Sequence, residues 1–410
     1  MKAVRPYPII TITNKGRKAI ESGHPWVYEG EVLSCPEGTP NGAIVDVLSE
    51  KGTWLGAGLL SLTSLIRVRL LSRNANDTFD DAFWLRRFRY AWAYRKTVLE
   101  RADLPACRVV FGESDGLPGL TVDRFGDVLV VQTLSFGLEQ RKAQLFPLLV
   151  QALREDGQEI RAVYERNDEG LRDKEGLPQG KGFFPLPGEE PPMSTVTQIM
   201  ENGVKYSVDF ENGQKTGFFL DQKYNRRAVG RLARGKRVLD CFTHTGSFAL
   251  NAAMGGAERV TAVDVSQLAV DMARSNACLN RLEDRMDFLC ADVFDLLPKL
   301  AEEKRRDWDF IILDPPAFTK SRKTADQAAR GYKEINYRAM RLLPRGGYLA
   351  TCSCSHFMEE HRFLGVIQAA ARDAGVQLKQ IEARQQAPDH PILMGVPETN
   401  YLKFYLFQVV

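Results

Sequence analysis

Four aspartates in the C-terminal half of the sequence each follow a short apolar segment. They are Asp240, Asp264, Asp292 and Asp314. In a parallel sheet, ligands bind beyond the carboxyl ends of the strands, so we expect these carboxylates to gather at one edge. Each of them alone is an ordinary turn or helix-capping residue. Four in succession indicate a binding site.

The turn after the first of these segments indicates which ligand the edge binds. It contains a single glycine, Gly246, and lacks the G-x-G-x-x-G pattern that lets a backbone approach a pyrophosphate. An acidic edge also repels a dinucleotide, which disfavours a dehydrogenase. S-adenosylmethionine carries no phosphate, and its sulfonium, ammonium and ribose diol all suit carboxylates. We therefore predict that Asp264 binds the ribose, Asp292 lies near the adenine, and Asp240 or Asp314 lies near the methionine ammonium. The further cofactor-binding candidates are Phe242, Thr245, Gly246, Val265 and Pro315.

A thiol follows a further strand-like segment. Cys354 lies just past residues 348–351, a strand that neighbours Asp314 in a sheet of this class. A free cysteine is most often a small buried hydrophobe. Loops at strand ends, however, are where functional residues concentrate. Cys354 is accordingly a candidate nucleophile.

The elements that position these residues form an alternation of strands and helices. Apolar strands are predicted at 237–242, 260–263, 286–289, 310–313 and 348–351, with helices between them. Such alternation is typical of an α/β, doubly wound, Rossmann-like parallel sheet. Two later β-like runs, 376–382 and 401–409, are predicted to form an antiparallel pair at one edge.

The N-terminal half has a different rhythm. Short β-like runs at 9–13, 43–48 and 66–71 are separated by Gly, Pro and Asn, which predicts a small β-barrel. An amphipathic helix follows at 80–101, with Trp84, Phe88 and Trp92 on one stripe; we expect these to be core and the surrounding arginines to be solvated. Strands are predicted within 109–123 and at 128–134, and the Gly- and Pro-rich residues 174–195 are predicted to be a linker.

Bulk properties limit the classes of protein. With 410 residues the chain should form two or three domains. A net charge of +3 means that any nucleic-acid surface is a local patch. We expect no signal peptide, no membrane association and no metal site. The seven cysteines lack disulfide or metal spacing, which predicts free thiols in a cytoplasmic protein.

Several motifs together resemble one family. Residues 240–248 (DCFTHTGSF), 263–266 (VDVS), 313–318 (LDPPAF) and 353–355 (SCS) resemble the bacterial large-subunit ribosomal RNA methyltransferase I family, which makes 5-methylcytosine. The resemblance extends to residues 213–222, 386–391 and 401–403. It covers nearly the whole C-terminal half, and the combination is far more specific than any one motif.

The resemblance implies a three-part organisation. Residues 24–28 (HPWVY) are similar to the family's RNA-binding PUA domain, so we expect a PUA-like barrel at 1–75, a central α+β domain at 80–185 and the methyltransferase domain at 190–410. Lys18, His24 and Trp26 become candidate RNA contacts. By the same resemblance Phe218 covers the methionine end of the donor. The implied partner is large-subunit ribosomal RNA, and homodimer formation stays open.

The resemblance also gives Cys354 a role. Cytosine C5 accepts a methyl group only after a thiolate adds at C6, and Cys354 is the predicted nucleophile. Asp314 is predicted to hold the cytosine amino group or N3, with Pro316 and Phe318 against the base. Other cytosine-C5 RNA enzymes carry a second cysteine where this sequence has Ala317. Cys352 either takes over part of that role or serves in packing, and packing is favoured.

Two hypotheses other than cytosine-C5 methylation remain open, one enzymatic and one non-catalytic. The segment Asp314-Pro315-Pro316-Ala317-Phe318 also resembles the motif of enzymes that methylate exocyclic amines, and a related branch methylates a ring nitrogen of guanine. Neither chemistry needs Cys354. A third hypothesis is a non-catalytic RNA-binding assembly factor with a relic fold, which the intact aspartates disfavour.

Overall fold

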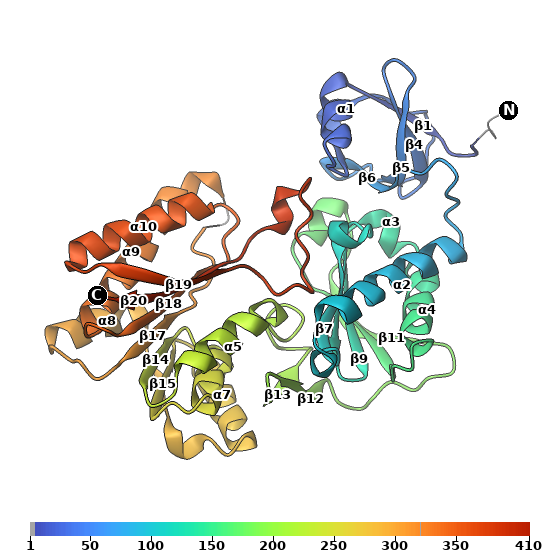
Figure 1. Cartoon of the computed structure of the whole chain (residues 1–410). Coiled ribbons are helices and arrows are strands. Elements are labelled where there is room, and N and C mark those ends of the chain that lie inside the picture. Colours follow the sequence, from blue (N-terminus) through green and yellow to red (C-terminus); the bar gives the residue numbers. More distant parts are fainter. Residues whose placement is uncertain (1–4, 320) are drawn as a thin grey trace. The chain divides into compact units, whose positions relative to one another are not determined.

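The computed structural model (Figure 1) describes residues 5–319 and 321–410. The chain divides into two compact units. The first unit runs to Ile199 and also includes Ser207–Leu220 and Pro388–Thr399. The second unit comprises Met200–Tyr206, Asp221–Ala387 and Asn400–Val410. A methyltransferase domain that begins at residue 190 therefore does not coincide with the second unit, because residues 190–199, Ser207–Leu220 and Pro388–Thr399 belong to the first unit.

The first unit begins with a six-stranded sheet of order β2-β6-β5-β4-β1-β3. Its strands are β1 (Ile9–Ile12), β2 (Trp26–Tyr28), β3 (Val32–Ser34), β4 (Ile44–Ser49), β5 (Trp54–Leu60) and β6 (Ile66–Ser72). Helix α1 (Asn14–Glu21) is capped by the Thr13 hydroxyl. Alternating strand residues such as Ile10, Val45 and Val68 fill the core beside this six-stranded sheet. The small β-structure predicted for this region is confirmed.

Helix α2 (Asp81–Val98) follows, with the Asp80 carboxylate as its N-cap. Trp84, Phe88 and Trp92 are 0%, 0% and 2% exposed, which confirms them as core residues. The expectation that the surrounding arginines are solvated is wrong for Arg95, which is 0% exposed. Its guanidinium is buried because it donates to both oxygens of Asp115, with Nη2 at 2.8 Å from Oδ2.

A five-stranded sheet of order β11-β10-β9-β8-β7 packs with α2. Its strands are β7 (Ala106–Phe111), β8 (Leu120–Phe125), β9 (Val128–Thr133), β10 (Ala162–Asn167) and β11 (Gly180–Phe184), and helices α3 (Phe136–Glu139) and α4 (Lys142–Arg154) follow β9. Strand β11 corrects the prediction that 174–195 is a linker. It pairs antiparallel with β10, and the Phe183 and Tyr164 ring centroids lie 5.0 Å apart.

The two returning segments join this central sheet through buried polar contacts. Asp389 accepts a hydrogen bond from the Arg108 backbone N–H at 3.0 Å. The Thr216 hydroxyl donates to Asp123 at 2.5 Å, and the same carboxylate accepts two bonds of 2.7 Å from the Arg108 guanidinium. These contacts explain why Ser207–Leu220 and Pro388–Thr399 belong to the first unit. A two-stranded sheet pairs β12 (Val196–Glu201) with β13 (Val204–Asp209), and β13 runs into the first of these segments.

The second unit contains a seven-stranded sheet of order β16-β15-β14-β17-β18-β20-β19. The strands are β14 (Arg237–Cys241), β15 (Arg259–Asp264), β16 (Met286–Cys290), β17 (Phe310–Leu313), β18 (Tyr348–Ser353), β19 (Leu378–Arg384) and β20 (Lys403–Val409). The first five pair in parallel, and β20 runs antiparallel to both β18 and β19. The predicted strands, their parallel pairing and the antiparallel edge pair are confirmed.

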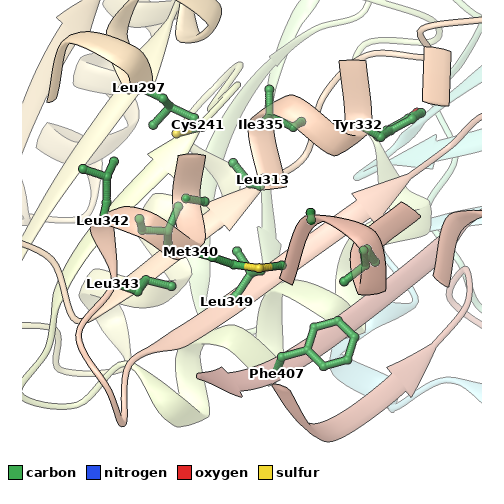
Figure 2. Packing of buried hydrophobic residues seen from close by; sticks show 14 of the residues in the cluster. Cys241, Leu297, Leu313, Tyr332, Ile335, Met340, Leu342, Leu343, Leu349 and Phe407 are labelled. Atoms are coloured by element: carbon green, nitrogen blue, oxygen red, sulfur yellow. The ribbon is translucent and has the colours of Figure 1, made fainter. Parts of the chain in front are cut away.

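In the described part of this unit, six α-helices flank the sheet, namely α5 (Lys223–Leu232), α6 (Ser247–Met254), α7 (Gln267–Leu279), α8 (Val293–Glu302), α9 (Ala325–Leu342) and α10 (Glu360–Ala374). The close-up in Figure 2 shows the apolar layer between α8–α10 and the strands, where Cys241, Leu313 and Leu349 meet Ile335 and Met340. Since alternate strand residues point to opposite faces, Asp240 lies on the other face from Cys241. Within 5–319 and 321–410, no helix has the length and apolar character required to cross a bilayer.

Candidate active site

The turn after β14 is held in an unusual backbone conformation. Phe242 and His244 have φ values of 65° and 50°, in the left-handed region that side chains other than glycine rarely adopt. The Asp264 carboxylate accepts the His244 N–H at 2.9 Å. Gly246, with φ 81°, ends the turn, and a Cβ there would lie 3.0 Å from the Ala273 Cβ. Strain of this kind persists where surrounding contacts fix it, and it concentrates at functional sites.

Asp240 is fully buried beneath this turn. Its Oδ2 accepts the Thr243 hydroxyl at 2.6 Å and the Ala249 N–H at 3.0 Å. Its Oδ1 is buried without a hydrogen-bond partner among the described residues. Burial, with Asp314 and Asp264 nearby, raises the pKa of Asp240 to about 7. A buried carboxylate oxygen without a partner provides a place for a cationic ligand group.

Asp264 and Asp292 stand at the ends of the next two strands, as predicted, and each also supports the backbone. Asp264 accepts the Ser266 N–H at 3.0 Å, and Asp292 is the N-cap of α8, accepting the Phe294 N–H at 2.8 Å. Carboxylate oxygens retain further acceptor capacity after one such bond. Structural use of these aspartates does not prevent ligand binding.

Apolar side chains are exposed around these two aspartates. Val265 is 68% exposed, Leu289 is 40% exposed and Phe294 is 38% exposed. Val265 follows the carboxyl end of β15, beside Asp264. Leu289 and Phe294 lie on either side of the carboxyl end of β16 in the sequence, near Asp292. Exposed apolar groups next to carboxylates match an adenosine group, which has a flat ring and a diol.

The residues of this edge fit S-adenosylmethionine. The Asp240 Oδ1 and the Thr245 Oγ1 are buried without partners among the described residues, so polar ligand atoms could satisfy both. No Lys, Arg or His nitrogen lies within 4 Å of the carboxylates of Asp240, Asp264, Asp292 or Asp314 in the described chain, which leaves these charges for a cationic ligand. The first turn therefore suits a donor with an ammonium and a sulfonium.

Asp314 lies after β17, next to the cofactor turn. Its Oδ1 accepts the Gln222 side-chain amide at 3.0 Å, and the Cys352 thiol lies beside it. Burial, followed by the field of Asp221, raises the pKa of Asp314 to about 7. The carboxyl therefore exists in both protonation states near neutrality and can either donate or accept a hydrogen bond.

The rest of the Asp-Pro-Pro segment presents an apolar surface. Pro315 is buried, whereas Pro316 and Ala317 are exposed. The half-buried Phe318 ring lies 4.6 Å from the Tyr332 ring, centroid to centroid, and 5.6 Å from the Phe294 ring. The segment thus offers an aromatic side chain and a carboxyl group at one place, as base stacking and base recognition require.

Cys354 follows the last residue of β18 and is half-buried. Burial, together with the fields of Asp314 and Asp221, raises the pKa of the Cys354 thiol to about 12. Cys352, in the same strand, is 0% exposed, and burial raises the pKa of its thiol too. Cys352 lies beside Asp314, and which of its two predicted roles it takes stays a prediction.

The other predicted site residues lie in the first unit. Lys18 is exposed on α1. The half-buried His24 accepts the Trp26 N–H at 3.2 Å, and Trp26 donates its indole N–H to Glu113 at 2.9 Å. Phe218 is 4% exposed. The roles of these four residues in RNA or donor binding stay predictions.

Several residues of the second-unit site were not predicted from the sequence. Gln222 and Asp221 flank Asp314, Tyr332 supports Phe318, and Lys403 lies near Cys354. Gln222 and Lys403 stand within the stretches 213–222 and 401–403 that carry the family resemblance, which is the signal that could have found them.

Comparisons with known proteins agree with this geometry. Residues 186–408 match the family described as S-adenosylmethionine-dependent methyltransferase, and residues 10–73 match a PUA-like domain. The chain is 40% identical to "Ribosomal RNA large subunit methyltransferase I" of Klebsiella pneumoniae (strain 342), over 98% of this chain and 99% of that protein. It is 41% identical to the protein of the same name from Cronobacter sakazakii, over 97% and 98%.

Solved structures show the same fold. A putative methyltransferase complexed with SAH, SMU.776, has a TM-score of 0.81 at 22% identity and covers 98% of this chain and 100% of that one. A putative SAM-dependent methyltransferase from Streptococcus mutans has a TM-score of 0.80, also at 22% identity, with the same coverage. The chain is an S-adenosylmethionine-dependent methyltransferase with an N-terminal PUA-like domain, and it belongs to the ribosomal RNA large subunit methyltransferase I family.

Proposed function

We propose that this protein forms 5-methylcytosine in large-subunit ribosomal RNA by covalent catalysis through Cys354. The observation that carries the proposal is the half-buried thiol at the end of β18, within the field of the Asp314 carboxyl. The relatives at about 40% identity are named for ribosomal RNA of the large subunit, which supplies the substrate class. Such a substrate would place the reaction in the cytoplasm.

The reaction needs a nucleophile at C6 and polarisation of the ring. Cys354 forms a bond from Sγ to C6, which makes C5 electron-rich. The protonated Asp314 carboxyl donates to N3, or the carboxylate accepts from the exocyclic amine, and Gln222 orients that carboxyl. Phe318 stacks on the base after the nucleotide has left its helix. After C5 is methylated, the C5 proton leaves and the bond from Sγ to C6 breaks.

The donor edge would hold S-adenosylmethionine, which supplies an electrophilic methyl group when bound. Asp240 and Thr245 would meet the methionine end, Asp264 the ribose, and Val265 and Asp292 the adenine. The turn 242–246 would shape the backbone around the donor. Because these carboxylates are already fixed by backbone N–H groups, they would change little on binding.

The PUA-like domain is the proposed RNA-binding module. Lys18 is the best-placed single contact, because its ammonium is exposed on α1. His24 and Trp26 are engaged within the first unit by Glu398 and Glu113, so they would shape the surface near any RNA contact rather than form most of it.

The test of the covalent mechanism is trapping on a fluorinated substrate. Ribosomal RNA from a strain lacking the protein, with 5-fluorocytosine in place of cytosine, should form a stable RNA–protein adduct, because fluorine cannot leave C5 as a cation. Cys354→Ala should form none, and its turnover on ordinary RNA should fall on the order of 10³-fold or more. Cys278→Ala, which removes an exposed thiol on α7, is the matched control and should behave as the wild type.

A second candidate function is methylation of an exocyclic amine or ring nitrogen. The exposed Asp-Pro-Pro segment with Phe318 favours it, since that arrangement alone suffices to hold an amino group. In that case Cys354→Ala keeps normal turnover, no adduct forms, and the product nucleoside shows a nitrogen-linked methyl group. That combination of results would replace the cytosine-C5 assignment.

A further inference from the structure

Cys354 lacks the usual arrangement of an activated thiol. Reactive cysteines have a lowered pKa from nearby cations or a helix N-terminus, whereas burial raises the pKa of this thiol to about 12. The carboxyl groups of Asp314 and Asp221 contribute to that rise. A thiol in this state is a weak nucleophile near neutral pH. Some other group must take its proton when the sulfur reacts.

The antiparallel last strand brings one amine to this place. Lys403 begins β20 and is paired directly with Ser353, the last residue of β18. Its side chain extends past that pair, and Nζ donates a hydrogen bond to the Ser355 carbonyl at 2.6 Å. Cys354 lies between these two contact points in the chain. The Lys403 ammonium is the cation whose field opposes the rise in the pKa of Cys354.

The Lys403 ammonium also has little negative charge close to it. It is 7% exposed, and no carboxylate oxygen lies within 4 Å of its Nζ in the described parts of the chain. Glu360, from α10, faces it at longer range, but this carboxylate accepts the Tyr405 hydroxyl. A buried ammonium with one carbonyl partner is poorly stabilised. An anion that forms at Cys354 would provide the missing partner.

We propose that Lys403 controls the ionisation of Cys354, accepting the thiol proton so that a thiolate–ammonium pair forms when the sulfur attacks. This inference rests on the proposed function of Cys354 as nucleophile. The bond from Sγ to hydrogen breaks, the proton moves to the neutral amine, and Sγ bonds to C6. The electron pair of the C5–C6 double bond moves into the ring toward N3, which takes a proton from the Asp314 carboxyl.

The protonation state of Lys403 suits this role. Burial, which outweighs the fields of Cys354 and Glu360, lowers the pKa of Lys403 to about 8. An amine with a pKa near the working pH is available in its neutral form and still basic enough to accept a proton. The charged groups that face the thiol are Lys403, Asp314 and Asp221, and Glu360 faces Lys403.

The test measures the thiol directly rather than methyl transfer. The full-length protein is alkylated with iodoacetamide between pH 6 and 10, and the rate at Cys354 is followed by peptide mass mapping, with the exposed Cys290 as internal reference. The wild type should show an inflection near pH 8. Lys403→Met should lose this inflection and react roughly tenfold more slowly at pH 8.5, the effect of about one pKa unit.

Two further variants separate charge, proton transfer and folding. Lys403→Arg keeps a positive charge that does not titrate in this range, so it should react within about threefold of the wild type at pH 7 and show no inflection near pH 8. Lys379→Met, which removes an exposed lysine from the neighbouring strand β19, should match the wild type. Thermal melting of each variant verifies that it is folded.

The outcomes are distinct from those of the trapping experiment. A Lys403→Met profile that superimposes on the wild type would overturn the inference, and so would an inflection near pH 8 that survives in Lys403→Arg. Either result leaves the covalent mechanism standing if Cys354→Ala abolishes the RNA adduct. Conversely, a fully active Cys354→Ala removes the covalent mechanism, whatever the alkylation profiles show.

Discussion

Buried ion pairs occur in both units, Arg226 with Glu201 in the second unit among them, whereas the acids at the carboxyl edge of the second unit are not paired. Arg95 and Arg172 are fully buried and form ion pairs with Asp115 and Glu139. At the carboxyl edge of the second unit, Asp240 and Asp314 have no such partner among the described residues, and the pKa of each is raised to about 7. Paired charges fix the architecture. Unpaired acids retain the capacity to bind a ligand or to exchange a proton.

The largest effect should come from breaking a paired charge in the first unit. Asp115→Ala leaves the Arg95 guanidinium buried with only carbonyl acceptors, so the free energy of unfolding should fall by about 3–5 kcal/mol. Urea denaturation measures this. The double variant Arg95→Met/Asp115→Ala removes the unpaired charge and should recover part of the loss. A double variant as unstable as the single one would contradict the explanation.

Removing an unpaired acid should have the opposite sign. The folded-state pKa of Asp240 is raised, so the native state loses stability as pH rises from the unfolded value near 4 to about 7. Asp240→Asn lacks this loss. Between pH 5 and pH 8, the difference in free energy of unfolding between variant and wild type should therefore shift in favour of the variant by about 2 kcal/mol. Calorimetry should also show weaker binding of S-adenosylmethionine. Equal stability differences at the two pH values would contradict the raised pKa.

The strained turn at the donor edge should tolerate little added volume. Gly246→Ala adds a Cβ 3.0 Å from the Ala273 Cβ at a φ of 81°, so we expect a loss of about 1–3 kcal/mol. Gly235→Ala is the matched control, because its φ is 67° and nothing lies within 4 Å of the new atom. The difference between the two variants in thermal unfolding gives the steric contribution to the loss of stability. Equal losses would mean that backbone strain alone is responsible.

The smallest effect should come from a pair that is exposed. Arg259 and Asp287 form an ion pair in the second unit with side chains 49% and 50% exposed. Arg259→Ala should change the free energy of unfolding by less than about 1 kcal/mol, and the change should shrink further in 1 M salt. Urea denaturation at two salt concentrations measures it. A larger change would show that exposure is a poor guide to the value of a charge pair in this protein.

The sheet of the second unit could be predicted closely from the sequence, because its strands are apolar and evenly spaced. Residues 310–313 were predicted and observed as the same strand, β17, and the other parallel strands agree within two residues at each end. The strand-end position of Asp314 follows from that regularity. Gln222 and Lys403 could not be placed in the same way. One lies before the sheet and the other across an antiparallel pair, so their approach to Asp314 and Cys354 depends on tertiary packing.

In the first unit the local pattern was less informative. Strand β11 lies in a Gly- and Pro-rich stretch, and its pairing with β10 becomes visible only in the folded sheet. Arg95 looks like a solvated residue on an amphipathic helix, and its acceptors come from Asp115 and from the distant segment that contains Asp389. Long-range partners of this kind leave no periodic signal in the sequence.

The position of β20 has a consequence for how the chain reaches its folded state. Strand β19 pairs only with β20 among the described strands, and β20 stands between β18 and β19 although it is later in the sequence than both. Synthesis of β20 is therefore required before the sheet of the second unit can be completed. The first unit likewise cannot be completed before the late segment Pro388–Thr399 has been synthesised. Both units are thus expected to leave apolar edges uncovered until nearly all of the chain has left the ribosome, a period during which such surfaces favour aggregation or chaperone binding.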